Sequence, residues 1–317
     1  MNMKKRALKQ GRDVSFIGLC RTPAGRVMTA FLFVALLAAA AKAYTGQDKA
    51  HAVGTAVRWY PPLDVMRNIY HESILQTPAL KHAYDVSVQG TSASEAIANS
   101  QKALQVCKNY VSAGHGDKNG MIEAYTIIAY CHFNIGEFQT NEADRIKSYE
   151  AARDAAQKLI DVAPGIWDGY IWYAAALGRM GQIQGVMKSL FLLEPLKKHL
   201  FQAEKICPGN PFVLDAIGDM YRQLPWIAGG SMSKAREYLE KAVQADPNFT
   251  LGRLDLAITL LEDGQKDKAR VLLNEVVDTQ TPSWRAHWLI WERPKAEALL
   301  SNMDNYKDLL KQWYLLI

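Results

Sequence analysis

The chain has 317 residues, of which 49% are hydrophobic and 22% are charged, and its formal net charge is +5. These values are ordinary for a globular protein with a substantial buried core. The charge is uneven, because residues 1–43 carry eight basic side chains against Asp13 alone, a net charge of +7, which leaves −2 for the rest. A nearly neutral body offers no electrostatic footprint for nucleic acid, so nucleic-acid binding is not expected.

Residues 1–43 have the pattern of a targeting segment. A basic stretch precedes a 15-residue apolar run, Val27 to Ala41, which is shorter than the roughly 20 residues of a membrane span. Ala41 and Ala43 are small residues at the two positions that a signal peptidase reads, so we expect cleavage after Ala43 and export to the periplasm. The alternative is an uncleaved segment that anchors the protein in the inner membrane.

Residues 44–90 form a lead-in to the main domain. A short helix is expected over 63–75, and residues 83–92 are expected to be a loop. Ser92 stands three residues before Glu95, the spacing of a capping box, so a helix should start there and run to about Val111.

The stretch from 91 to 282 repeats one pattern four times. Each copy has a large–small pair in a first helix, a turn, and small and large residues that face back from a second helix. The copy after Pro247 is the most regular, with Leu256 and Ala257 as the pair and Gly264 at the turn. The copies close at Pro164, Pro208, Pro247 and Pro282. The pattern predicts an all-α tetratricopeptide-like solenoid of about four helix pairs, because stacked pairs bury a continuous core.

Residues 283–317 are expected to be C-terminal capping helices. Three tryptophans, at positions 284, 288 and 291, have the spacing of one helix face, which favours a cap or a subunit contact over a cofactor site. Pro294 is expected to break this helix.

Insertions relative to a 34-residue template shrink from 11 to 10 to 5 residues along the first three copies. Each falls at the turn between the two helices of a copy, so the extra residues should lie on one edge, commonly a binding edge. The first insertion is either a loop or an early start of the second helix near Glu142, and its charge-rich sequence favours the longer helix. The second, within Val186–Leu193, is apolar.

The third repeat resembles a known family. The run Asp219–Pro225, then Gly229-Gly230, Lys234–Tyr238 and Asp246-Pro247, is similar to the T-component family of TRAP transporters. The resemblance covers roughly residues 120–280. It implies a periplasmic accessory protein, a homotrimer with a central pore, a hydrophobic ligand channel, and docking of a periplasmic substrate-binding protein. Eukaryotic regulators of microtubule dynamics share a similar Leu-Pro-Trp repeat, but the export-type leader argues against that branch.

The apolar insertion is the first candidate for ligand contact. It contains more apolar residues than one helix face needs, so Phe191 and Leu192 are predicted to contact a hydrophobic small molecule or lipid, with Met187 as an adaptable wall. The alternative is burial against the first repeat or a neighbouring subunit.

Two tryptophans are further ligand-binding candidates. Trp226 is predicted to shape a channel mouth or to anchor a packed loop. Tyr170, Trp172 and Tyr173 alternate around one helix, so we expect the tyrosines in the core and Trp172 in a groove.

Catalysis finds little support, and no enzyme activity is expected. The chain has no metalloprotease, nucleophile-elbow, phosphate-loop or dinucleotide fingerprint, and neither a metal nor a cofactor is predicted. His132 beside Cys131 suggests a nucleophile pair, but a histidine held within repeat packing is favoured. Cys107 and Cys131 either form a disulfide or, with Cys207, are three buried thiols.

Three functions are open from sequence alone. The first is a periplasmic accessory protein that binds a hydrophobic ligand and a substrate-binding protein. The second is a ligand-free periplasmic scaffold that docks a peptide or an envelope protein in its concave face. The third is a lipid-trafficking component built on the same fold.

Overall fold

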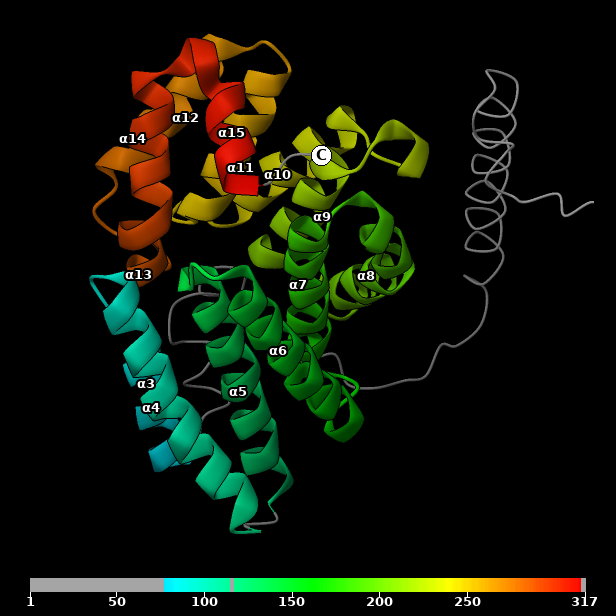
Figure 1. Cartoon of the computed structure of the whole chain (residues 1–317), viewed down its shortest axis with the longest axis vertical. Coiled ribbons are helices and arrows are strands. Elements are labelled where there is room, and N and C mark those ends of the chain that lie inside the picture. The colour runs from blue at the N-terminus through cyan, green and yellow to red at the C-terminus, as the bar shows by residue number, and fades with distance from the viewer. Residues whose placement is uncertain (1–76, 115–116, 315–317) are drawn as a thin grey trace, which may run out of the picture. The chain divides into compact units, whose positions relative to one another are not determined.

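The computed structural model describes residues 77–114 and 117–314, and every regular element within these ranges is helical (Figure 1). The leader, its apolar run and the helix expected over 63–75 lie outside the described residues. The first half of the described chain contains α3 (Pro78–Ser87), α4 (Ala93–Ser112), α5 (Lys118–Phe138), α6 (Glu142–Val162), α7 (Trp167–Gln184) and α8 (Val186–Ile206). None of the described helices is long and apolar enough to cross a bilayer.

The second half continues with α9 (Pro211–Gln223), η3 (Trp226–Ala228), α10 (Met232–Ala245), α11 (Thr250–Glu262) and α12 (Lys266–Asp278). It ends with α13 (Arg285–His287), the π-helical turn η4 (Trp288–Glu292), α14 (Arg293–Ser301), η5 (Met303–Asn305) and α15 (Tyr306–Tyr314). Residues 225–229, which contain η3, form a separate unit, and the other helices named here belong to one compact unit.

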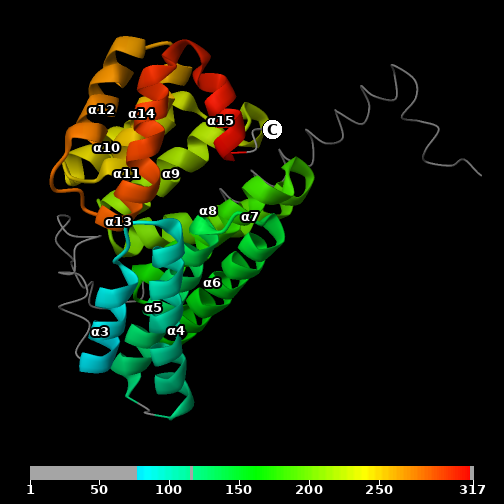
Figure 2. The same ribbon diagram turned by 60° about the vertical axis from the view of Figure 1, so that its left-hand side comes forward.

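Consecutive helices of the main unit pack against each other in four pairs, α5 with α6, α7 with α8, α9 with α10, and α11 with α12 (Figures 1 and 2). A proline follows the second helix of each pair, as predicted. The fold is therefore the expected all-α tetratricopeptide-like array of four helix pairs with capping helices. The first helices α5, α7, α9 and α11 also contact their neighbours in that order, and we call them the inner layer.

Most of the predicted small and large positions form the core, whereas Tyr125, Leu196 and Tyr221, which also occupy such positions, are half-buried. The core members are fully or almost fully buried, which stabilises the fold by about 1.5–3 kcal/mol for each large aliphatic side chain. The members are Ala152, Ala156, Leu159, Leu200, Ala203, Ala235, Leu239, Ala242, Leu256, Ala257, Ala269, Leu273 and Val276.

Two glycines allow paired helices to approach closely. A Cβ added at Gly218 of α9 would lie 2.6 Å from Leu239 Cγ and 3.1 Å from the Ala235 carbonyl oxygen of α10. A Cβ at Gly136 of α5 would lie 2.6 Å from the Tyr149 ring of α6. The small member of the large–small pair in α9 therefore fixes the distance between its two helices.

The first two insertions lengthen second helices instead of forming loops. Helix α6 begins at Glu142, as expected, and Asn141 caps it by accepting a hydrogen bond from the Asp144 N–H at 3.1 Å. The negative charges of Glu142 and Asp144 in its first turn also interact favourably with the positive end of the helix dipole. Helix α8 absorbs the apolar insertion from Val186 onward.

At the N-terminal end of the described chain, one expectation is wrong. Residues 83–87, expected to be loop, belong to helix α3, because Pro78 starts the helix and Leu80, Ala83 and Tyr84 bury its apolar face. The helix start at Ser92 is confirmed, since Ser92 accepts from the Glu95 N–H at 3.3 Å, but Glu95 accepts from the Thr91 N–H at 3.0 Å instead of completing the capping box at Ser92.

Pro294 does not break the C-terminal helix. The preceding turn η4 is π-helical, and the Arg293 N–H donates to the Trp288 carbonyl five residues earlier. The wider turn accommodates the proline ring, which would clash in a regular α-helix. The helical run therefore continues from α13 through η4 into α14.

Candidate functional site

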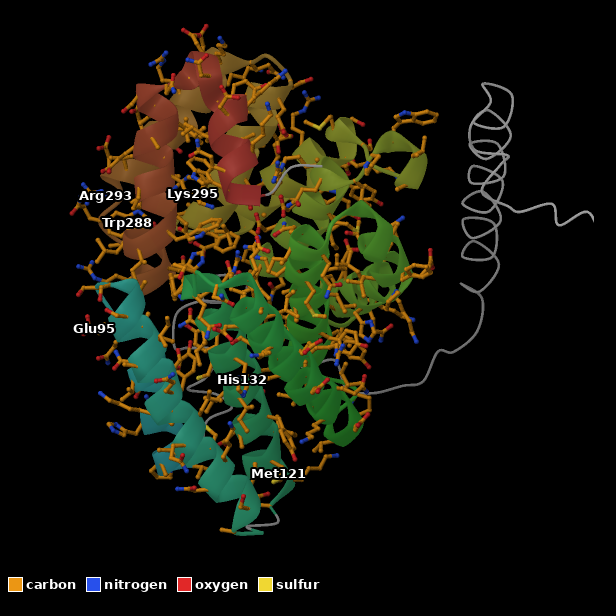
Figure 3. The ribbon with its side chains drawn as sticks, viewed as in Figure 1. Glu95, Met121, His132, Trp288, Arg293 and Lys295 are labelled. Atoms are coloured by element: carbon orange, nitrogen blue, oxygen red, sulfur yellow. The ribbon has the colours of Figure 1, made fainter. Side chains whose placement is uncertain are left out.

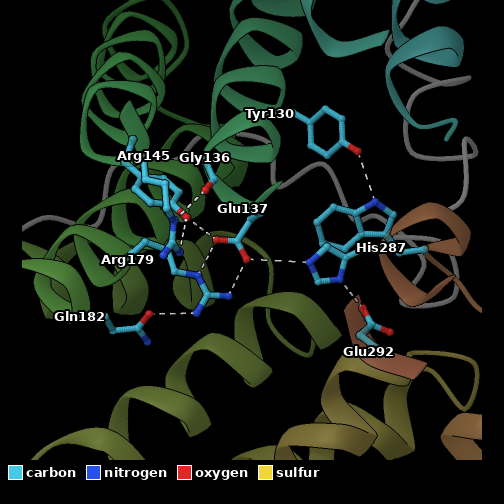
Figure 4. A network of polar contacts seen from close by, with 10 residues as sticks. Tyr130, Gly136, Glu137, Arg145, Arg179, Gln182, His287 and Glu292 are labelled. Atoms are coloured by element: carbon cyan, nitrogen blue, oxygen red, sulfur yellow. Dashed lines mark hydrogen bonds and ion pairs between the residues drawn. The ribbon is translucent and has the colours of Figure 1, made fainter. Parts of the chain in front are cut away.

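The densest polar cluster within the described residues lies on the inner layer, around Glu137 of α5 (Figure 4). Arg179 of α7 donates to both oxygens of Glu137, with Nε 2.8 Å from Oε1 and Nη2 2.9 Å from Oε2. The Tyr149 hydroxyl donates to the same carboxylate at 2.7 Å. Burial alone would raise the pKa of Glu137, but Arg179 and the hydrogen bonds from His287 and Tyr149 hold it well below its ordinary value.

His287 links this cluster to the C-terminal helices. Its Nδ1 lies 2.5 Å from Glu292 Oε1, and its Nε2 lies 3.9 Å from Glu137 Oε2. Its ring stacks on Trp284 with 4.0 Å between ring centroids, and Trp284 Nε1 donates to the Tyr130 hydroxyl of α5 at 3.3 Å. Burial lowers the pKa of His287, yet the bonds and charges of the two glutamates outweigh burial and raise it above 6.5. An imidazole ring between two carboxylates therefore joins sequence-distant parts of the chain.

The second part of the site is acidic. Asp215 of α9 and Asp255 of α11 are 3% and 5% exposed, and the Oδ1 atom of each has no hydrogen-bond partner among the described residues. Beside them, Asp219 accepts from Arg222 at 2.5 Å and also from Gln223. Buried oxygens without donors are costly, so this part of the inner layer retains unused capacity to accept hydrogen bonds.

Charges on neighbouring helices determine the protonation of this cluster. Burial first, and then the charge of Asp219, raises the pKa of Asp255 to about 7. Burial and the charge of Asp255 raise the pKa of Asp215 well above its ordinary value. Lys295 of α14 is 8% exposed, its Nζ lies 3.0 Å from the Trp291 ring centroid, and burial lowers its pKa well below 10.5. Asp215 and Asp255 can therefore hold protons near neutral pH.

Figure 3 shows Trp288 and Lys295 on the C-terminal helices and His132 on α5. Within the described residues, no group of three or more His, Cys, Asp or Glu side chains is arranged to hold a metal ion.

The aromatic residues of α7 are arranged opposite to expectation. Trp172 is 6% exposed and packs against the rings of Tyr130, Phe133 and Phe212, with centroids 5.3–5.6 Å away. Tyr170 and Tyr173 are instead half-buried. The large apolar area of the indole favours the centre of the core, whereas a tyrosine hydroxyl can reach solvent. Ligand contact at Trp172 stays a prediction.

The residues predicted to contact ligand on α8 and in the third insertion do not share one environment. Phe191 is 83% exposed, and Leu192 packs partly buried against the main core. Met187 belongs to α8, but its side chain lies outside the described residues. Trp226, described by itself on η3, is 84% exposed. Ligand contact by these residues stays a prediction.

The residue pair Cys131–His132 does not have the properties of a nucleophile and its base. Cys131 is fully buried, and burial raises the pKa of its thiol well above 9.0. Burial also lowers the pKa of His132 to about 4, so the ring is neutral at physiological pH. Cys107, Cys131 and Cys207 are buried thiols that form no disulfide with one another.

Sequence reasoning missed the charged network. Glu137, Arg179 and His287 come from separate helices, so their pairing follows only from the stacking of the first helices and the return of the tail. One signal was present in the sequence, namely ionisable residues such as Asp215 and Asp255 within otherwise apolar first helices. Because such residues are rarely buried without a partner, they indicate a polar cluster.

Comparison with known families agrees with the helix pairs. A family model described as tetratricopeptide repeat matches residues 227–288. Together with the four stacked pairs, this match means that the chain is a helical-repeat protein with tetratricopeptide-type repeats.

A second family model, described as regulator of microtubule dynamics protein 1-3, matches residues 92–228. A crystal structure of a thermophilic tetratricopeptide-repeat protein from Thermus thermophilus is similar at 17% identity, over 70% of this chain and 97% of that chain, with a TM-score of 0.49. No curated protein matches the chain. Neither matching family model is that of the TRAP T-component, so that relationship stays a proposal.

Proposed function

We propose that this chain is a non-catalytic scaffold that docks a protein partner. The observation that carries the proposal is the uninterrupted stacking of helix pairs from α5 to α12, because stacked repeats present extended surfaces that suit binding of another chain. The buried, protonated thiol of Cys131 and the neutral ring of His132 give no support to covalent catalysis.

The exposed aromatic side chain on α8 supports a docking role for its first turns. Phe191 presents 83% of its surface to solvent although its helix neighbour Leu192 packs on the core. Aromatic side chains are enriched among the residues that dominate binding energy in interfaces. We therefore place one partner contact at Phe191.

Paired surface variants test this scaffold function. Phe191→Ser should lose a partner that the wild-type chain cross-links in its native cell. Val271→Ser, which changes a 57% exposed side chain on α12, should retain that partner. Equal partner recovery by both variants would remove Phe191 from the interface. Recovery of no specific partner by the wild type would count against the scaffold.

The match over residues 92–228 supports a narrower candidate, a role at microtubules, because the matching family is named for regulating their dynamics. The excess positive charge lies in residues 1–43, so we expect chain 1–317 to co-sediment with polymerised tubulin more strongly than chain 44–317 does, and the difference to shrink with salt. No co-sedimentation of either chain at low salt would reject this candidate.

The resemblance to the TRAP T-component supports another candidate: a periplasmic or inner-membrane-anchored accessory protein that binds a hydrophobic molecule or lipid and a substrate-binding protein. Native mass spectrometry of chain 44–317, purified without detergent, separates it from the ligand-free scaffold. A homotrimer with a releasable apolar adduct would favour the accessory role or lipid trafficking. A bare monomer would favour the scaffold.

A further inference from the structure

The segment Ser283–Lys295, here called the docking segment, packs against the inner layer, and Trp284 belongs to the main hydrophobic core. It follows the fourth repeat but returns to the first, where Trp284 bonds to Tyr130, 154 positions earlier. His287 faces Glu137 of α5, and Glu292 accepts a hydrogen bond from Thr250 of α11. A segment from one end of the array therefore contacts helices from both the first repeat (Figure 4) and the fourth repeat.

The contact surface of the docking segment is unusually charged for a permanent cap. His287, Glu292 and Lys295 are 1%, 0% and 8% exposed, so three ionisable groups are desolvated where apolar side chains could fill the same space. Buried ion pairs gain little stability over well-packed apolar residues, but they make binding selective for charge. Asp215 and Asp255 still keep oxygens without donors nearby. The receptor surface is thus only partly satisfied by its present occupant.

The backbone of the docking segment is irregular. Helix α13 has 3 residues and η4 is π-helical. Pro294, in the first turn of α14, has no N–H to donate. Short helices and π turns have fewer favourable backbone hydrogen bonds than long α-helices, so this segment can open at a lower free energy than the repeats around it.

We propose that the inner layer is a receptor for a helical protein segment that carries tryptophans three or four residues apart and a lysine or arginine one turn further on, and that the docking segment occupies this receptor until a partner supplies such a segment. Trp284, Trp288, Trp291 and Lys295 have this spacing. This inference rests on the proposed scaffold function and names the chemistry of one partner.

The acceptor oxygens of the inner layer define the preferred cation. Asp219 of α9 and Glu137 of α5 present carboxylates, and Asp215 and Asp255 keep oxygens without donors. Arginine has five N–H donors in a fixed fork, whereas lysine has three on a single nitrogen. A partner with arginine at the position of Lys295 can therefore satisfy more of the acidic oxygens than the docking segment does.

Binding of a synthetic peptide to the full chain tests the proposal. The probe is a fluorescent peptide with the sequence of residues 283–301, and the protein is either wild type or Trp284→Ala, which loosens the docking segment. The peptide can bind only those molecules in which the docking segment has left the receptor. The apparent affinity for the peptide is therefore reduced in proportion to this open fraction, and we expect at least tenfold tighter binding to Trp284→Ala than to wild type. Val106→Ser on α4 is the matched control and should bind the peptide as wild type does.

Peptide variants test the chemistry. A peptide with Lys295→Arg should bind at least as tightly as the parent peptide, and one with Lys295→Glu at least tenfold more weakly. No binding of the parent peptide to a folded Trp284→Ala chain, or equal binding of the Lys295→Glu peptide, would overturn the proposal. The scaffold function would survive that result, because its own test depends on Phe191.

If Trp284→Ala does not fold, hydrogen exchange of the wild-type chain tests whether the docking segment opens more readily than the repeats. Amides of α13, η4 and α14 should exchange at least tenfold faster than those of α9 and α11. Equal protection of these helices would show the docking segment to be a permanent part of the core, and the proposal would then be wrong.

Discussion

Small residues decide where the helices of each pair touch. Gly218 occupies the small position of the third pair, and its Cα faces the Leu239 side chain and the Ala235 carbonyl. The same reason applies to Ala257 in the fourth pair, which is 0% exposed. Contact between helices at these points sets the register for every larger side chain in the pair.

Gly218→Ala should destabilise the protein by about 1–3 kcal/mol, because its new methyl group would overlap Leu239 and press on the Ala235 carbonyl. Gly165→Ala is the control, since a Cβ there meets nothing within 4 Å, and we expect a change within about 0.5 kcal/mol. Urea unfolding followed by circular dichroism measures both. Equal stability of the two variants would mean that α9 and α10 are not in the register described.

His287 makes the stability depend on pH. Its pKa is raised in the folded state, so its contribution is complete below 6.5 and is lost as the pH rises through the folded value. Asp255 acts in the same direction between its ordinary 3.8 and about 7. Glu137, whose pKa is lowered, contributes fully above 4.5 and adds no slope there. We therefore expect His287 and Asp255 to lower the free energy of unfolding as the pH rises through neutrality, whereas His132 below pH 6.5 and Lys295 act in the opposite direction.

His287→Gln should flatten part of that fall. Each unit of pKa difference corresponds to about 1.4 kcal/mol, so the change is measurable by urea unfolding at several pH values. The groups that face His287, namely Glu137 and Glu292, remain in the variant, as do Arg179 and Lys295 nearby. An unchanged pH dependence in His287→Gln would assign the slope to the aspartates instead.

The packing positions could be predicted well from the sequence, whereas the charged site could not. Small–large alternation depends on neighbours within about 34 residues, so Ala235, Leu239 and Ala242 could be placed in the core from spacing alone. The ion pair between Glu137 and His287 depends on the path of the tail, which no local pattern specifies. Trp172 was misplaced because helical periodicity does not say which face of a first helix meets the core.

At the scale of elements, two prolines within helical runs have different surroundings. Pro195 lies inside the 21-residue helix α8 and removes one hydrogen bond from it. Pro294 follows the π-helical turn η4, whose carbonyls are already displaced from the α-helical pattern. The length of α8 and the early start of α6 also explain why inserted residues cause no break in the array.

Pro195→Ala should stabilise the protein by about 1–2 kcal/mol, because the helix regains an N–H donor and loses a steric conflict, partly offset by a more flexible unfolded chain. Pro294→Ala should change stability by less than about 0.5 kcal/mol or lower it slightly. Thermal unfolding of the two variants side by side makes the comparison. A larger gain for Pro294→Ala would contradict the accommodating role of η4.

At the scale of the whole chain, cysteine reactivity reports both folding and processing. Cys107, Cys131 and Cys207 are buried thiols outside any disulfide with one another, and burial raises the pKa of Cys107 to about 12. The native protein should therefore react slowly with a thiol reagent at all three positions. In denaturant the count should be three for a chain cleaved after Ala43 and four for a chain that retains Cys20. A count of one would indicate a disulfide.

The return of the tail to the first repeat changes how such an array unfolds. In an open solenoid each repeat contacts only its neighbours, so the ends fray independently and folding can start anywhere. Here the bond between Trp284 and Tyr130 joins positions 154 residues apart and closes the array into a loop of contacts. Fraying of the first repeat then requires release of the docking segment. We expect the repeats to unfold in one cooperative transition, with slower folding than the local contacts of helix pairs alone would give.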